Sequence, residues 1–137
     1  MDLEAKALAL AIRQVESGGV AKTGASGELR SLYQFMPSTW KTLAKKHLGS
    51  EDANLTRENE NRVAYNEIVY YKKQGKTPAE IASIWNSGKP TWKGNVGINK
   101  QGVRFDTPAY VRKVYQEYQK QKRRLTGGYD AHEAGTP

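Results

Sequence analysis

The sequence predicts a mainly helical fold, and three observations support this prediction. Apolar residues recur at helical spacing, as in the stripe formed by Leu8, Ile12 and Val15. Typical helix-start and helix-stop residues bracket these segments. Strand signals are limited to short stretches near residues 29–35 and 95–105, so we expect at most a small β-hairpin. The 137 residues suit one domain with a buried core.

Three helices are expected in the first half of the chain. The first covers about residues 3–17 and stops at the glycine pair 18–19. A glycine-, serine- and threonine-rich segment follows, and the second helix begins at Pro37, which suits a first-turn position. Thr56 is a suitable N-cap for a long third helix that ends at Gly75.

The clearest helix start is "TPAE" at residues 77–80, which combines an N-cap threonine, a first-turn proline and a capping-box glutamate. This helix is expected to end at Gly88. A loop rich in glycine and basic residues follows, and Thr107 begins the last helix. We expect a domain over residues 1–124 and a flexible tail over residues 125–137.

Several functional classes are disfavoured by composition. The chain has no cysteine, and its two histidines, His47 and His132, lack ligand spacing, so we expect no metal site and no cofactor. No apolar run approaches the roughly 18 residues that span a membrane. Acids precede the first lysine and Arg13 interrupts the first apolar run, so no signal peptide is recognised.

The net charge of +8 predicts attraction to polyanions such as nucleic acid, anionic membrane surfaces or cell-wall polymers. The densest basic cluster is "KQKRR" at residues 120–124, and it contains no aromatic residue. Other basic residues are scattered along the chain. Nucleic-acid binding is therefore disfavoured, because it favours basic residues concentrated on one element with interleaved aromatics.

One acidic residue stands out at the end of the first helix. On a helical projection Glu16 lies about 80° from Leu8 and about 40° from Ile12, at the edge of the apolar stripe. Partial burial there would raise the pKa of its carboxyl, as a proton donor near neutral pH requires. Taken alone, however, a glutamate near a helix end is more often an ordinary surface charge.

Four segments, in order, resemble the motifs of the soluble lytic transglycosylases, which are peptidoglycan-cleaving members of the lysozyme-like superfamily. They are "ESGG" at 16–19, "YQFMPSTW" at 33–40, "IASIWNSG" at 81–88 and "TPAYVRKVY" at 107–115. The resemblance spans roughly residues 5–118. It implies a lysozyme-like fold of about five to seven helices. It also implies cleavage between N-acetylmuramic acid and N-acetylglucosamine that leaves a 1,6-anhydromuramic product.

The resemblance also implies roles for individual residues. Glu16 matches the catalytic acid, and the substrate-contacting positions are matched by Ser17, Gln34, Trp85, Asn86 and Tyr110. Tyr110 resembles the tyrosine that points at the acid. Two positions depart from the family pattern: Ser31 stands where a glycine is usual, and Trp85 where a tyrosine is usual. A tryptophan can stack on a sugar ring as a tyrosine does.

The three tryptophans are divided between core and site, and two amide residues have two interpretations each. Trp40 is expected in the core, whereas Trp85 and Trp92 are the better sugar-stacking candidates. Asn86 either binds an acetamido group or caps the end of its helix. Gln34 either contacts substrate or is an ordinary loop amide.

A second acid would decide between two reaction types. Ordinary glycosidases use two carboxylates, and the candidates here are Glu28 and Asp106, of which Asp106 is expected to support a helix N-terminus. Glu28 is a surface loop acid, a substrate contact or an auxiliary base. A transglycosylase needs no second carboxylate, because the substrate's own groups complete the reaction.

The leading hypothesis is thus a peptidoglycan lytic transglycosylase. A hydrolytic muramidase on the same fold and a non-catalytic basic cell-wall-binding module are the alternatives. The expected partner is the peptidoglycan glycan strand, with no nucleic acid, no membrane insertion and a monomeric protein. Action on the wall would require a periplasmic, extracellular or virion-associated location, and the sequence does not choose among these.

Overall fold

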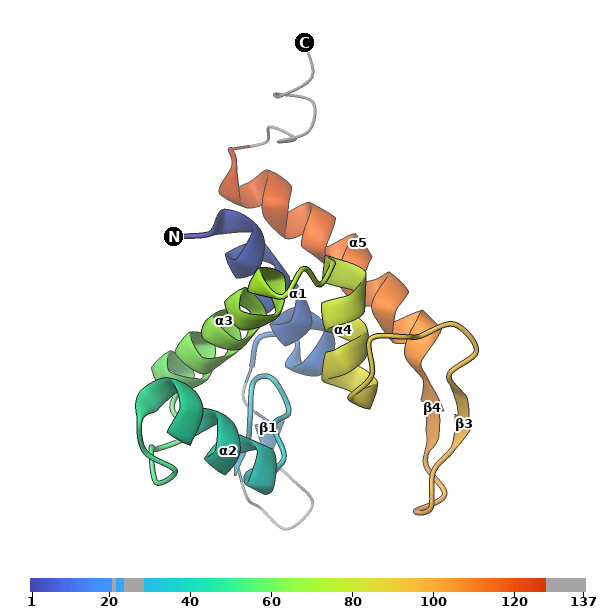
Figure 1. Cartoon of the computed structure of the whole chain (residues 1–137), viewed down its shortest axis with the longest axis horizontal. Coiled ribbons are helices and arrows are strands. Elements are labelled where there is room, and N and C mark those ends of the chain that lie inside the picture. The colour runs from blue at the N-terminus through green and yellow to red at the C-terminus, as the bar shows by residue number, and fades with distance from the viewer. Residues whose placement is uncertain (21, 24–28, 128–137) are drawn as a thin grey trace.

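Five helices dominate the computed structural model, which describes residues 1–20, 22–23 and 29–127 (Figure 1). The helices are α1 (Leu3–Ser17), α2 (Pro37–Leu48), α3 (Arg57–Lys73), α4 (Pro78–Ser87) and α5 (Thr107–Leu125). The mainly helical prediction is therefore confirmed. The expected tail lies mostly outside the described residues, and Leu125, its first residue, still belongs to α5.

The strands form two short antiparallel pairs rather than one. They are β1 (Lys22–Thr23) with β2 (Leu29–Arg30), and β3 (Val96–Ile98) with β4 (Arg104–Asp106). The sequence signals near residues 29–35 and 95–105 correspond to β2 and to the β3–β4 hairpin. The segment that contains β1 is rich in small polar residues, so its pairing with β2 had no sequence signal.

Local capping explains where the helices begin and end. The Asp2 side chain accepts a hydrogen bond from the Ala5 amide at the start of α1, and Gly18 ends the helix in the left-handed conformation at φ +70°. At α4 the predicted capping box is present. Thr77 Oγ1 accepts from the Glu80 amide, and Glu80 Oε1 accepts from the Thr77 amide.

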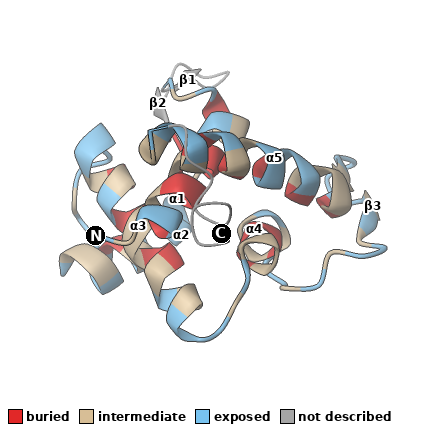
Figure 2. Cartoon of the chain, turned by 90° about the horizontal axis from the view of Figure 1, so that it is seen from above, coloured by how far each residue is buried: buried red, intermediate tan, exposed pale blue. Residues whose placement is uncertain are grey.

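Helix α1 is the centre of the main core. Four alanines (Ala5, Ala7, Ala9 and Ala11) are buried, and their small side chains allow α3 and α5 to pack closely against α1. Helix α4 packs on α5 in turn. Figure 2 shows the buried residues on the inward faces of these helices. The larger core side chains are Leu8, Ile12, Leu32, Tyr33, Ile68, Ile81, Val111, Val114 and Tyr118.

A smaller cluster joins α2 to α3. Trp40 and Ala44 of α2 pack against Val63 of α3, and the Trp40 indole N–H donates to the Ala53 carbonyl oxygen at 2.9 Å. The prediction that Trp40 lies in the core is confirmed. This cluster fixes α2 on one side of the molecule, opposite the projecting β3–β4 hairpin (Figure 1).

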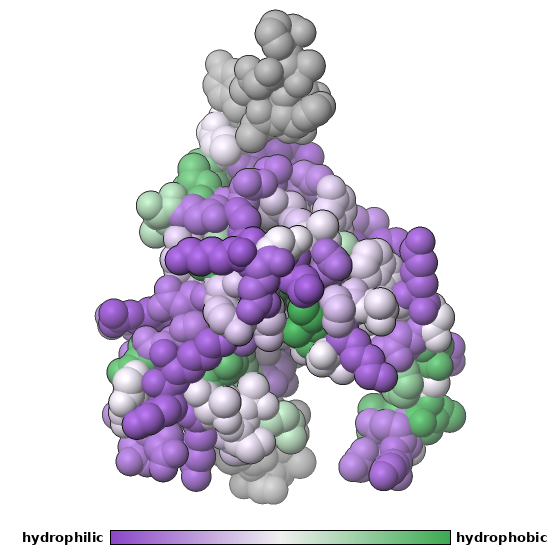
Figure 3. Space-filling view, viewed as in Figure 1, coloured by the Kyte–Doolittle hydropathy of each residue, from purple (hydrophilic) through white to green (hydrophobic). Residues whose placement is uncertain are grey.

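The surface is hollowed between α2 and the β3–β4 hairpin. Figure 3 shows this hollow in the space-filled molecule, with the hairpin forming one wall. Among the described residues, no helix combines the length and apolar character needed to cross a membrane.

The capping box of α4 allows a test of the fold. Replacing Thr77 by alanine removes the N-cap acceptor, and we expect the free energy of unfolding to fall by about 1 kcal/mol in urea denaturation. Thr77→Ser should retain most of the stability. Thr42→Ala, which removes an exposed mid-helix hydroxyl of α2, should cost nothing measurable; an equal loss there would contradict the capping explanation.

Candidate active site

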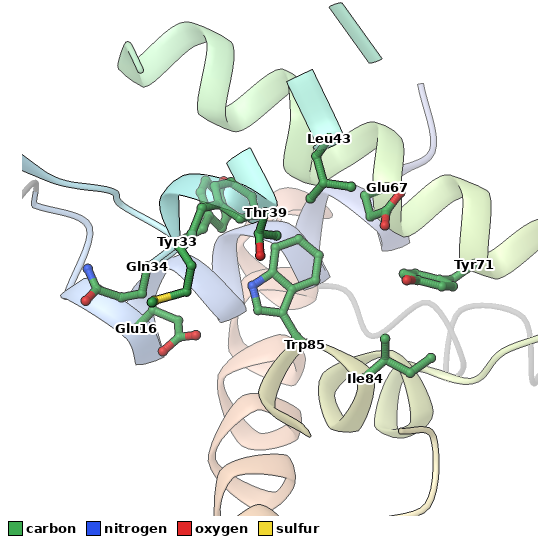
Figure 4. Close-up of a pocket in the computed structure, with 11 residues that line it drawn as sticks. Glu16, Tyr33, Gln34, Thr39, Leu43, Glu67, Tyr71, Ile84 and Trp85 are labelled. Carbon is green, nitrogen blue, oxygen red and sulfur yellow. The ribbon is translucent and has the colours of Figure 1, made fainter. Parts of the chain in front are cut away.

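A cavity of about 190 Å³ lies beside the C-terminal end of α1. Its walls come from α1, the turn before α2, α2 itself, α3 and α4 (Figure 4). The lining residues are Glu16, Tyr33, Gln34, Phe35, Met36, Thr39, Leu43, Glu67, Tyr71, Ile84 and Trp85. Three residues that the sequence assigned to the site, Glu16, Gln34 and Trp85, are therefore brought together in one cavity.

Glu16 is the partly buried acid of this cavity. It occupies the last turn of α1, on the edge of the apolar face, as the helical projection predicts. Burial raises the pKa of its carboxyl from 4.5 to about 7, against the opposing effect of a hydrogen bond from Tyr110. The carboxyl therefore carries its proton for a substantial part of the time at neutral pH.

Tyr110 orients this carboxyl from the first turns of α5. Its hydroxyl donates to Glu16 Oε2 at 3.3 Å, which links residues 94 positions apart in the chain. Burial and the nearby Glu16 charge both raise the pKa of the Tyr110 phenol, so it remains a donor. Asp106 accepts from the Ala109 amide and caps α5, which is the helix-supporting role expected of it.

The turn before α2 carries Gln34 into the cavity in an uncommon backbone conformation. Gln34 has φ +57°, and among the described residues it is the only non-glycine with positive φ. Its side-chain Nε2 donates to the Ser31 carbonyl oxygen at 2.6 Å, and its own amide donates to the same oxygen at 3.2 Å. The Ser31 hydroxyl accepts from the Phe35 amide. Ser31, a departure from the family pattern, thus closes the turn itself.

A buried glutamate of α3 stabilises the turn that carries Gln34. Glu60 of α3 is only 3% exposed, and its Oε1 accepts from the Tyr33 amide at 3.4 Å. Burial raises the pKa of Glu60, while hydrogen bonds from Leu32, Tyr33 and Ser31 oppose that rise. The turn is therefore held by one serine and one glutamate that lie 29 positions apart in the sequence.

Trp85 of α4 forms an aromatic wall. Its ring centroid lies 5.6 Å from that of Phe35 and 6.2 Å from that of Tyr33. These contacts hold the indole where it borders the cavity. Aromatic faces of this kind suit the apolar faces of sugar rings, which is the role expected of Trp85.

Other predicted site residues lie outside this cavity. Ser17 is buried, and its hydroxyl donates to the Arg13 carbonyl oxygen and accepts from the Gly19 amide, so it closes the end of α1. Asn86 accepts from Thr107 Oγ1 at 2.8 Å and borders a separate polar pocket at the base of the hairpin. Trp92 packs against the core. Glu28 lies outside the described residues.

A second carboxylate that the sequence analysis missed also borders the cavity. Glu67 of α3 is buried, and its Oε1 accepts from Lys46 Nζ at 2.8 Å and from His47 Nε2 at 2.9 Å. Burial alone would raise the pKa of Glu67, but these two partners outweigh it and hold the pKa below its usual value. A signal was available, because Glu67 falls among Ala64, Ile68 and Tyr71 on the face expected to be buried.

The described residues contain no group of three or more histidine, aspartate or glutamate side chains placed to hold a metal ion. His47 Nε2 contacts Glu67 Oε1 at 2.9 Å. The polar and aromatic groups that line the cavity include two carboxyl groups, two phenols, an amide and an indole, from Glu16, Glu67, Tyr33, Tyr71, Gln34 and Trp85.

Comparison with known proteins identifies no relative. No protein family model and no curated protein sequence matches the chain, and no solved structure matches its fold. The resemblance to the soluble lytic transglycosylases remains a hypothesis based on four ordered motifs.

The raised pKa of Glu16 predicts a pH-dependent gain in stability for Glu16→Gln. Above pH 7 the wild-type carboxyl is charged in both states, and the folded state must desolvate that charge. The glutamine variant should then be more stable by about 1–3 kcal/mol. The gain should shrink as the pH falls through 7 and vanish below 4.5, where the carboxyl is protonated in both states. Urea denaturation at several pH values measures this, and a gain independent of pH would contradict burial as the cause.

Removing the Tyr110 hydroxyl should move the titration of Glu16 upward. The hydrogen bond from Tyr110 favours the carboxylate, so Tyr110→Phe should give a higher Glu16 pKa, as measured by ¹³C NMR titration of labelled glutamate. Tyr115→Phe is the matched control, because Tyr115 lies on the same helix and is exposed. Equal shifts in the two variants would contradict the assigned contact.

Proposed function

We propose that the protein is a peptidoglycan lytic transglycosylase that cleaves the β-1,4 bond between N-acetylmuramic acid and N-acetylglucosamine. The observation that carries this proposal is the partly buried Glu16, whose pKa is raised to about 7 and whose carboxyl is oriented by Tyr110 beside an aromatic wall. A proton donor for glycosidic oxygen needs this combination of retained proton and fixed direction.

Glu16 would act twice in the reaction. As an acid it protonates the glycosidic oxygen, the bond from that oxygen to the anomeric carbon breaks, and N-acetylglucosamine leaves as the alcohol. The acetamido group of N-acetylmuramic acid stabilises the positive charge on its own ring. The Glu16 carboxylate then removes the proton of the C6 hydroxyl, and that oxygen attacks the anomeric carbon. The 1,6-anhydro ring forms, and Glu16 regains its proton.

The second carboxylate at the cavity, Glu67, is poorly suited to activate water, which supports a mechanism that uses Glu16 alone. Among the described residues that line the cavity, the other acid is Glu67, which already accepts from Lys46 and His47. An ion-paired carboxylate with a lowered pKa is a poor base for activating water. Asp106 is engaged as the cap of α5. Intramolecular attack by the C6 hydroxyl requires neither residue.

The net charge also suits the proposed substrate. Peptidoglycan and the polymers attached to it are anionic, so a protein of net charge +8 is attracted to them. Dissolved salt limits this attraction to a distance of about 10 Å. Figure 3 shows a hollow between α2 and the β3–β4 hairpin in which such a polymer can lie. The proposed place of action is therefore the cell wall.

The products test this proposal. The wild-type protein should release muropeptides that carry 1,6-anhydromuramic acid from purified peptidoglycan, as identified by mass spectrometry. Glu16→Gln should lower the release rate at least about 100-fold, because the glutamine cannot donate a proton. Glu58→Gln is the matched control, since Glu58 is exposed in the first turn of α3, and it should keep full activity.

Other products would identify the alternatives. Products one water heavier, with reducing ends, would indicate a hydrolytic muramidase on the same scaffold. Binding to the wall without release would indicate a non-catalytic module. Full activity of Glu16→Gln would contradict the assignment of the acid.

A further inference from the structure

The end of the cavity away from Glu16 is polar and has no part in the reaction described above. Its polar groups are those of Glu67 and Tyr71, which lie one helical turn apart on α3, and the apolar Leu43 and Ile84 lie beside them (Figure 4). Figure 4 shows Trp85 between Glu16 on one side and these two residues on the other. One cavity thus joins a proton donor, an aromatic surface and a second polar end.

The charge at this second end is already balanced. Glu67 Oε1 receives both Lys46 and His47, and Lys46 Nζ also lies 3.4 Å from the centre of the Tyr70 ring. Neither of these two hydrogen bonds uses the other carboxylate oxygen, Oε2. Burial, the Glu67 charge and a hydrogen bond to the Glu67 side chain raise the pKa of the Tyr71 phenol to about 12, so its hydroxyl is neutral at physiological pH and keeps an oxygen lone pair for a further donor.

This balance decides which ligand chemistry fits. A cationic ligand would have to compete with Lys46 and His47 for the same carboxylate. An anionic ligand would lie beside the buried Glu67 carboxylate, whose cationic partner Lys46 is already engaged. A neutral group with O–H or N–H donors meets neither penalty, because a carboxylate oxygen and a phenol can both accept from it.

We propose that Glu67 and Tyr71 bind the hydroxyl or acetamido N–H groups of a further sugar ring, in the same glycan strand whose scissile bond lies at Glu16. This inference rests on the proposed function, and it adds a binding subsite that extends past Trp85 to α3. Trp85 then contacts the strand between the two ends, which explains why one cavity carries both an acid and an ion-paired carboxylate.

Binding of β-1,4-linked N-acetylglucosamine oligomers tests the subsite. The measurement uses Glu16→Gln as the parent, so that turnover does not interfere, and isothermal titration calorimetry with the hexamer as the probe. Adding Tyr71→Phe or Glu67→Gln should each weaken hexamer binding about five- to tenfold, the effect of one lost hydrogen bond. Adding Tyr70→Phe should change nothing, because Tyr70 lies next in the chain but does not line the cavity.

The outcomes separate this inference from the proposed function. If both Tyr71→Phe and Glu67→Gln bind the hexamer as tightly as the parent, the subsite is refuted while transglycosylase activity is unaffected. A parent that does not bind the hexamer also refutes the subsite, and the product analysis above judges the activity independently. Because Glu67→Gln removes the buried partner of Lys46, thermal unfolding of each variant is measured to show that it folds. If Glu67→Gln does not fold, the result for Tyr71→Phe alone tests the subsite.

Discussion

The packing of α1 against α5 is the interaction on which the site depends. The small alanine side chains of α1 allow neighbouring helices to approach it closely, and its packing with α5 brings Tyr110 to the Glu16 carboxyl across 94 positions of sequence. The same contact excludes water from one side of that carboxyl, which raises its pKa. Close helix packing therefore supplies both the direction and the protonation state of the proposed acid.

Three glutamates line the cavity or support the turn beside it, and their surroundings give their carboxyl groups different pKa values. Glu16 accepts a hydrogen bond from the Tyr110 phenol, and burial raises its pKa to about 7. Glu67 accepts hydrogen bonds from Lys46 and His47, and these contacts hold its pKa below the usual value. Glu60 accepts hydrogen bonds from a backbone turn and supports it. Burial raises the pKa of all three, and the partners decide how far each pKa departs from the usual value.

Much of the fold could be predicted from the sequence because its signals are local. Helical spacing, the capping box at Thr77 and the glycine stops depend on residues within a few positions of one another, and each is found in the structure. The pairing of β1 with β2 was not predicted, because two-residue strands carry too little pattern. The position of Glu16 on the edge of the buried face was also a local property, and it was predicted correctly.

The sequence by itself determined the helices, their ends and the partial burial of Glu16, since each follows from neighbouring residues. Only the tertiary structure decided which distant residues share the cavity. Gln34 and Trp85 line the same cavity as Glu16, and so do Glu67 and Tyr71 from the C-terminal half of α3. Ser17 and Asn86 make other contacts outside it. The physical reason is that helix spacing specifies which face is buried, whereas the packing of whole helices specifies what that face meets.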